Sequence, residues 1–151
     1  MTHFYNPPRK SQEISRKNIL TVNEPNELEL ALSSPDFRQV RLLKMKNSNI
    51  TDETTKCLLK VDFELQVEKI DISENFSFVT DDTLITLAQC KALHRLGSIN
   101  LADNNISDEG VRIMSDSGVF SRLRELVLYG NSGITNESLL ALAASEWIKG
   151  L

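Results

Sequence analysis

The sequence has few of the features that mark secreted or membrane-bound proteins. Only two cysteines, Cys57 and Cys90, occur in 151 residues, which excludes a disulfide framework. No apolar run approaches the ~20 residues that cross a bilayer. Residues 1–10 lack the apolar centre of a signal peptide. We therefore expect a single domain that is cytoplasmic and has no contact with a membrane.

Basic charge is not in excess either, and familiar catalytic motifs are missing. The chain has 17 Lys and Arg against 21 Asp and Glu, a net charge of −4. A nucleic-acid binder needs a basic face that displaces counterions, so the composition argues against that class. We find no phosphate-binding loop, dinucleotide fingerprint, zinc-protease motif or nucleophile elbow. We expect no enzyme, no cofactor and no metal, since Cys90 and His94 alone make a weak ligand pair.

What the sequence does have is an internal repeat in four copies. Each copy spaces apolar residues in the same way and places Asn or Ser at its ninth position. The copies begin 27, 29 and 27 residues apart. They are Val40-x-x-Leu43-x-Met45-x-x-Ser48, Val67-x-x-Ile70-x-Ile72-x-x-Asn75, Leu96-x-x-Ile99-x-Leu101-x-x-Asn104 and Leu123-x-x-Leu126-x-Leu128-x-x-Asn131.

The second half of each copy predicts a helix. A hydroxyl residue followed by acidic or amide residues is typical of a helix start, because the hydroxyl caps free amides and acids favour the positive end of the helix dipole. This capping also accounts for the acidic residues better than a calcium site does. Apolar residues then recur three apart, on one helix face. The four starts are Thr51-Asp52-Glu53, Thr80-Asp81-Asp82, Ser107-Asp108-Glu109 and Thr135-Asn136-Glu137.

The repeat resembles the leucine-rich repeat, L-x-x-L-x-L-x-x-N-x-L, and its length is similar to that of the ribonuclease-inhibitor-like subclass. The resemblance implies an α/β fold: a right-handed horseshoe segment, or solenoid, with parallel strands on the concave face and helices on the convex face. In that family the repeat Asn bonds backbone groups of its turn. Asn75, Asn104 and Asn131 match that position, whereas Ser48 departs from it, so we expect a less secure first turn.

These patterns divide the chain into three parts. We expect residues 1–18 to be a flexible basic tail and residues 19–39 to be an N-terminal capping unit with a shortened strand half. Four repeats follow, at 40–66, 67–95, 96–122 and 123–150. Leu151 falls at the first position of a fifth repeat, so we expect an open C-terminal end without a polar cap.

The resemblance implies a protein-interaction module that binds through its concave face. The third, fifth, seventh and eighth repeat positions are expected to point outward there. Tyr129 is the expected anchor of a protein partner. The alternative is that a Lys44–Asp71 cross-strand pair merely keeps this face soluble. The candidate partner-binding residues are Lys44, Lys46, Lys69, Asp71, Glu74, Asn100, Asp103, Glu125, Val127 and Tyr129.

Other functions stay open at this point. The chain is alternatively a structural subunit or a fragment of a larger assembly that docks, or self-associates, through its C-terminal repeat. The stretch from Leu142 to Leu151 also resembles bacterial effector-type repeat proteins. The basic tail offers docking on an acidic partner. GTPase activation by a loop arginine is a further alternative, with Arg112, Arg122 and Arg124 available.

Overall fold

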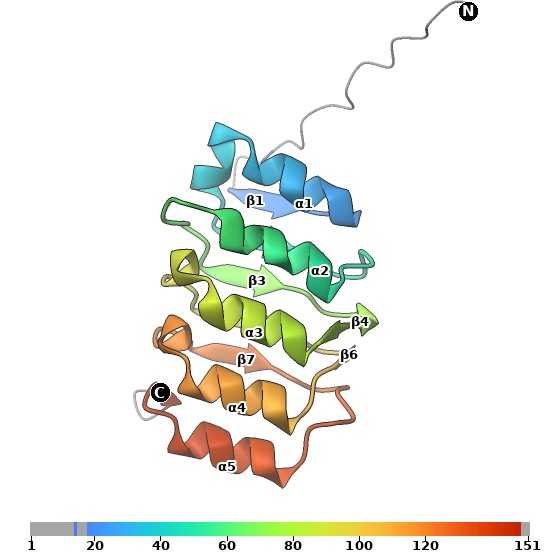
Figure 1. Ribbon diagram of the computed structural model, residues 1–151, viewed down its shortest axis with the longest axis vertical. Coiled ribbons are helices and arrows are strands. Elements are labelled where there is room, and N and C mark those ends of the chain that lie inside the picture. The colour runs from blue at the N-terminus through green and yellow to red at the C-terminus, as the bar shows by residue number, and fades with distance from the viewer. Residues whose placement is uncertain (1–13, 15–17, 149–151) are drawn as a thin grey trace, which may run out of the picture.

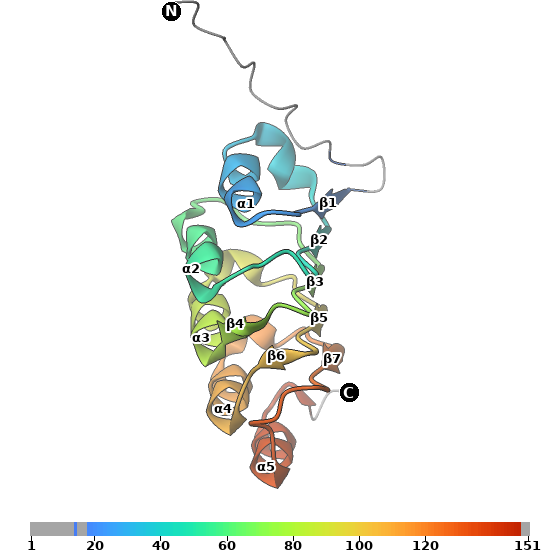
Figure 2. The ribbon, with the colours of Figure 1, turned by 90° about the vertical axis from the view of Figure 1, so that its right-hand side faces the viewer.

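The computed structural model describes Ile14 and residues 18–148. Nearly all of the predicted basic tail, and Leu151 with its predicted fifth repeat, lie outside the described residues. The chain forms an α/β structure in which a five-stranded parallel sheet, in the order β1-β2-β3-β5-β7, makes one layer. The helices make a second layer along one side of that sheet (Figures 1 and 2).

Each unit of the chain contributes one strand and one helix. The main sheet contains β1 (Ile19–Thr21), β2 (Leu42–Lys44), β3 (Lys69–Asp71), β5 (Ser98–Asn100) and β7 (Glu125–Val127). The helices are α1 (Pro25–Leu32), α2 (Asp52–Thr55), α3 (Asp81–Gln89), α4 (Asp108–Asp116) and α5 (Asn136–Ala144). A small parallel pair joins β4 (Phe76–Thr80) to β6 (Asn104–Asn105). Short 3₁₀ turns follow four of the helices: η1 (Pro35–Gln39), η2 (Lys56–Lys60), η3 (Lys91–Leu93) and η4 (Gly118–Phe120).

The helix starts predicted from the hydroxyl residues are confirmed. Thr51 is the N-cap of α2, and its Oγ1 accepts a hydrogen bond from the Thr54 amide at 3.2 Å. Thr80, Ser107 and Thr135 cap α3, α4 and α5 in the same way, each through the amide two residues later. These bonds satisfy amides that a helix start otherwise leaves without an acceptor.

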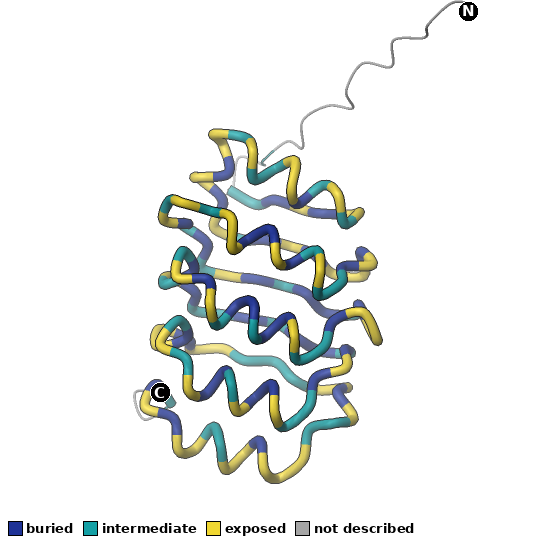
Figure 3. The backbone as a smooth tube through the Cα atoms, in the orientation of Figure 1, coloured by how far each residue is buried: buried dark blue, intermediate teal, exposed yellow. Residues whose placement is uncertain are grey.

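The core lies between the sheet and the helices (Figure 3). The central residue of each strand points into it, and register places Leu20, Leu43, Ile70, Ile99 and Leu126 side by side. All of them are fully buried except Leu126, which is partly buried. The apolar spacing of the repeat is therefore a core pattern, in which every strand gives one side chain to the same row.

Asn75 shows how one side chain links neighbouring turns. Its Oδ1 accepts bonds from the amides of Ser48 and Ile50 at 3.1 and 2.9 Å. Its Nδ2 donates to the carbonyls of Met45 and Ile72, both at 2.8 Å. Buried backbone groups need such partners because leaving one unpaired costs ~1–3 kcal/mol.

The first turn keeps part of this arrangement despite its serine. The Ser48 hydroxyl is directed at the carbonyls of Val22 and Lys46, at 2.6 and 2.9 Å. The Ser48 hydroxyl has one hydrogen and can donate to only one of these carbonyls at a time, whereas the side-chain amide of Asn75 has two N–H groups and can donate to two carbonyls at once. Three residues separate β1 from α1, against seven between β2 and α2, so the connection in the first unit is the shorter one. No helix within residues 18–148 is long and apolar enough to cross a membrane.

Candidate functional site: the strand face

The outer surface of the sheet, here called the strand face, consists of two rows of side chains that flank the buried central row. Parallel register aligns one residue from every strand in each row. Strand β1 adds Ile19 and Thr21, which the repeat pattern did not reveal because its unit lacks the Asn turn. The first row is Ile19, Leu42, Lys69, Ser98 and Glu125; the second is Thr21, Lys44, Asp71, Asn100 and Val127.

The expected Lys44–Asp71 pair does not form, although the register makes these residues direct neighbours. The Asp71 carboxylate instead accepts bonds from the Ser73 amide at 3.1 Å and the Ser73 hydroxyl at 2.6 Å. Lys46 pairs with Glu74 at 2.9 Å, and the hydrogen bond and charge of Glu74 raise the pKa of the Lys46 ammonium. Lys44 therefore stays exposed with no ion pair in the described part of the chain.

The seventh and eighth repeat positions lie beyond the strands, where the alternation of a strand does not apply. Ser73 and Ala102, at the seventh position, are buried, whereas Lys46 and Tyr129 are exposed. The eighth position has a left-handed backbone in all four units, with φ between 49° and 74°. Only Gly130 among these is a glycine; the others are Asn47, Glu74 and Asp103.

The remaining predicted residues differ in their surroundings. Lys69 is exposed at the start of β3, and no ion pair involves it within residues 18–148. Glu125 accepts a bond from the Ser98 hydroxyl at 2.7 Å. Asn100 accepts one from the Ala102 amide at 3.1 Å. Val127 is half-buried, while Tyr129 is 66% exposed in the turn that follows β7.

Two exposed phenylalanines beside this face escaped the sequence analysis. Phe76 and Phe78 belong to β4 and are 60% and 50% exposed. The sequence did contain a sign of this insertion. The second copy is 29 residues long instead of 27, and Val79 lies two residues farther from its turn asparagine than the repeat pattern requires. An open pocket of about 290 Å³ lies next to them, lined by Phe76, Ser77, Asp103, Asn104, Asn105 and Gly130.

The acidic residues at the helix starts also do more than the capping argument predicted. The Asp52 carboxylate accepts bonds from the amide and hydroxyl of Thr80 and of Thr83, at 2.6–3.1 Å. Asp81 binds Ser107 likewise, and a Cβ at Gly110 would clash with its carboxylate. Each aspartate thus ties its helix to the next one.

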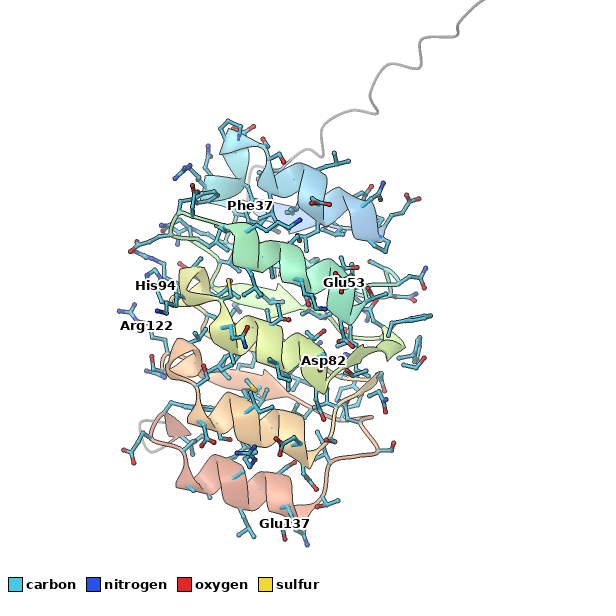
Figure 4. All side chains as sticks on the ribbon, in the orientation of Figure 1. Phe37, Glu53, Asp82, His94, Arg122 and Glu137 are labelled. Atoms are coloured by element: carbon cyan, nitrogen blue, oxygen red, sulfur yellow. The ribbon has the colours of Figure 1, made fainter. Side chains whose placement is uncertain are left out.

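Asp108 completes this series. It binds the amides and hydroxyls of Thr135 and Ser138, so it links α4 to α5. The Ser138 and Thr135 bonds lower the pKa of the Asp108 carboxyl to about 2, because they stabilise its charged form. In Figure 4 the acidic residues Glu53, Asp82 and Glu137 lie along the edge formed by the N-terminal ends of the helices.

The two cysteines are buried, whereas Arg112 and Arg122 are exposed. Burial raises the pKa of the Cys57 thiol to about 11 and also raises that of Cys90, so both stay protonated at neutral pH. No group of three or more metal-ligating side chains occurs among residues 18–148. Arg112 is engaged by Glu109 and Asp116, whereas Arg122 lies at the same edge as His94 (Figure 4).

No family model matches the chain, and no curated protein matches it either.

Proposed function

We propose that the chain is a leucine-rich repeat protein of the ribonuclease-inhibitor-like subclass, a solenoid segment that acts as a non-catalytic protein-interaction module. The repeat register supports this assignment, since equivalent residues of successive motifs are direct partners in the sheet. The turn asparagines support it too, because Asn75, Asn104 and Asn131 bond the backbone of their turns.

The observation that carries the function is the exposed strand face with its free charges. Lys44 and Lys69 lie on adjacent strands without ion pairs in the described part of the chain, and Glu125 lies at the far end of the row that contains Lys69. A charge gradient of this kind favours a partner with complementary charge and speeds association. Tyr129, an amphipathic aromatic residue, is typical of a binding anchor. We propose that a protein partner lies across these rows.

A capture experiment with matched variants tests this proposal. The strand-face variant carries Lys44→Ala, Lys69→Ala, Glu125→Ala and Tyr129→Ala. Its control carries the same kinds of change on the helices: Lys56→Ala, Lys60→Ala, Glu137→Ala and Leu30→Ala. Both must give a wild-type circular dichroism spectrum and melting curve.

Wild-type protein and both variants are then used as bait in a lysate of the source organism, and captured proteins are identified by mass spectrometry. We expect a partner that binds the wild-type chain and the helix control but not the strand-face variant. A partner retained by the strand-face variant and lost by the control would overturn the proposal and move recognition to the helices.

A second candidate function rests on the C-terminal helix. Leu139 and Leu140 of α5 are each 64% exposed, an unusual state for two adjacent leucines on a helix. A structural subunit would cover them with a neighbouring chain. Sedimentation over a range of concentrations tests this, with Leu139→Gln/Leu140→Gln against the control Leu30→Gln. Association that only the α5 variant abolishes favours the assembly role.

A further inference from the structure

The turn between β3 and α3 departs from the other turns of the chain. It holds two additional residues, and the segment Phe76-Ser77-Phe78 follows the turn asparagine directly. Its two aromatic rings project into solvent, at 60% and 50% exposure. A large exposed apolar surface of this kind marks an interaction site more often than an isolated exposed residue does.

The backbone at Phe76 is strained. Its φ is 50°, in the left-handed region that bulky side chains rarely occupy. The equivalent residue of the preceding unit, Asn49, has φ 52°, and asparagine tolerates this conformation much better. A strained residue that keeps an aromatic ring in solvent suggests a functional role for that ring.

The pocket beside Phe76 combines an apolar wall with a carboxylate. About 290 Å³ in volume, it is close to the lower end of the range for ligand pockets, ~300 Å³. Asp103 lines it, and no ion pair neutralises this carboxylate within the described residues. A Cβ at Gly130 would clash with the Asp103 carboxylate, so the glycine allows this close approach. The other lining groups are the polar residues Ser77, Asn104 and Asn105.

We propose that this pocket binds an arginine side chain of the protein partner, with the guanidinium against the Phe76 ring and paired with Asp103. A cation fits the charge of Asp103 and is attracted to an aromatic face. A guanidinium suits the site better than an ammonium because it is planar, stacks on rings and is less strongly hydrated. This inference rests on the proposed partner-binding function but assigns a separate contact, outside the two rows of the strand face.

The test is a titration of the ¹⁵N-labelled chain with N-acetyl-arginine amide, followed by amide chemical shifts. We expect saturable shifts at Ser77, Asp103, Asn105 and Gly130. N-acetyl-lysine amide should bind more weakly at the same residues, and N-acetyl-glutamine amide should produce no saturable shift. Shifts that do not saturate, or that spread evenly over the acidic helix starts, would overturn the proposal.

Two substitutions separate the proposed contacts without disturbing the turn. Phe76→Asn removes the ring and installs the residue found at the equivalent position, Asn49. Asp103→Asn removes the charge and keeps a residue that accepts positive φ. Each should raise the Kd for the arginine probe about tenfold, the effect of losing one charge-assisted or stacking contact. An unchanged Kd in both variants would overturn the assignment.

Further variants distinguish failure of this inference from failure of the proposed function. Asp36→Asn, which changes an exposed carboxylate on η1, is the matched control for charge and should leave the Kd unchanged. The substitutions Lys44→Ala and Lys69→Ala should also leave it unchanged, since they alter only the strand face. Partner capture that survives Phe76→Asn but not the strand-face changes would refute the arginine site and keep the proposed function.

Discussion

The two ends of the molecule are built from similar units but differ in how well they are closed. At the N-terminal end Leu20, Val22 and Leu28 are all buried, and η1 adds the buried ring of Phe37 to the core. Figure 4 shows Phe37 within the first units. At the other end the residues at the positions of Leu20, Val22 and Leu28 are less buried: Leu126 and Leu128 are partly buried, and Leu139 is 64% exposed. Position along the stack, more than residue type, therefore sets the burial of each unit.

Backbone hydrogen bonds show the same contrast. The amides of Met45, Ile72 and Leu101 each donate to a carbonyl of the following unit, at 2.7–2.9 Å. The next amide in this series, that of Leu128, has no such acceptor among residues 18–148. In a repeat structure each unit is stabilised mainly by its direct neighbours. A unit with one described neighbour should therefore be the weaker one.

The largest expected effect comes from one substitution made at both ends. Leu20 and Leu126 occupy the same row of the core, but only Leu20 is fully buried. Leu20→Ala should lower the free energy of unfolding by about 3 kcal/mol, and Leu126→Ala by about half of that. Urea unfolding followed by circular dichroism measures both, with the exposed Leu30→Ala as control. Equal losses at the two positions would mean that the C-terminal end is covered in solution.

The turn asparagines extend the comparison to polar groups. The Asn75 side chain bonds five backbone groups in the middle of the chain, while that of Asn131 bonds four, in its own turn and in the preceding unit. Asn75→Ala should cost about 3 kcal/mol, because buried amides and carbonyls lose their partners. Asn131→Ala should cost about 1–2 kcal/mol, since Asn131 bonds fewer groups and its two bonds within its own turn are only partly buried. Thermal melts of both variants test the order, and Ser48→Ala provides a mild reference within the first turn.

The sequence predicted the central row of the core because that row follows a strict spacing. Leu43, Ile70 and Ile99 recur at fixed intervals, and that interval becomes the sheet register. The helix starts were predictable for a similar reason, since capping depends on a local hydroxyl residue such as Thr80. Local rules and periodicity together determine most of this fold.

The features that were missed depend on contacts between units. The role of Asp52 could not be predicted, because its partners Thr80 and Thr83 belong to the next helix and lie about 30 residues away. Ser73 is buried and Tyr129 is exposed although both hold the seventh position, since the small Ser73 side chain bonds the Asp71 carboxylate of its own unit. The aromatic pocket arises where a two-residue insertion meets the neighbouring turn, so no single motif contains it.

Lowering the pH should weaken the C-terminal end through Asp108. This carboxyl has a folded-state pKa of about 2, below its ordinary value of 3.8, so its bonds to α5 stabilise the fold above pH ~4 and are lost as the pH falls toward 2. The urea midpoint of the wild-type chain should therefore exceed that of Asp108→Asn by a constant amount above pH 4. Below that pH the difference should shrink.

A carbon-13 titration of the Asp108 carboxyl gives an independent check, with an expected midpoint near pH 2. Asp36→Asn serves as the control, because Asp36 is exposed on η1 and makes no ion pair within residues 18–148. A difference between wild-type protein and Asp108→Asn that persists unchanged down to pH 2 would show that the α5 contact does not depend on this charge.

The smallest expected effect is a separation of two unfolding curves. Trp147 is the only tryptophan of the chain and is buried, and its indole Nε1–H has no hydrogen-bond partner among the described residues. Its fluorescence should report the C-terminal unit, whereas circular dichroism reports all helices. The free energy of unfolding falls by ~2 kcal/mol per molar urea. If the C-terminal unit is less stable by ~1 kcal/mol, the fluorescence midpoint should therefore lie about 0.5 M urea below the circular dichroism midpoint.

Moving the probe tests this interpretation. In a variant with Trp147→Phe and Phe63→Trp, the tryptophan lies nearer the closed end, where the Arg38 guanidinium contacts the Phe63 ring at 3.9 Å. The two midpoints should then coincide, since fluorescence would follow the stable part of the stack. Coincident curves already in the wild-type protein would mean that the open end unfolds together with the rest. Neighbouring units would then be coupled strongly enough to compensate for the contacts that the last unit lacks.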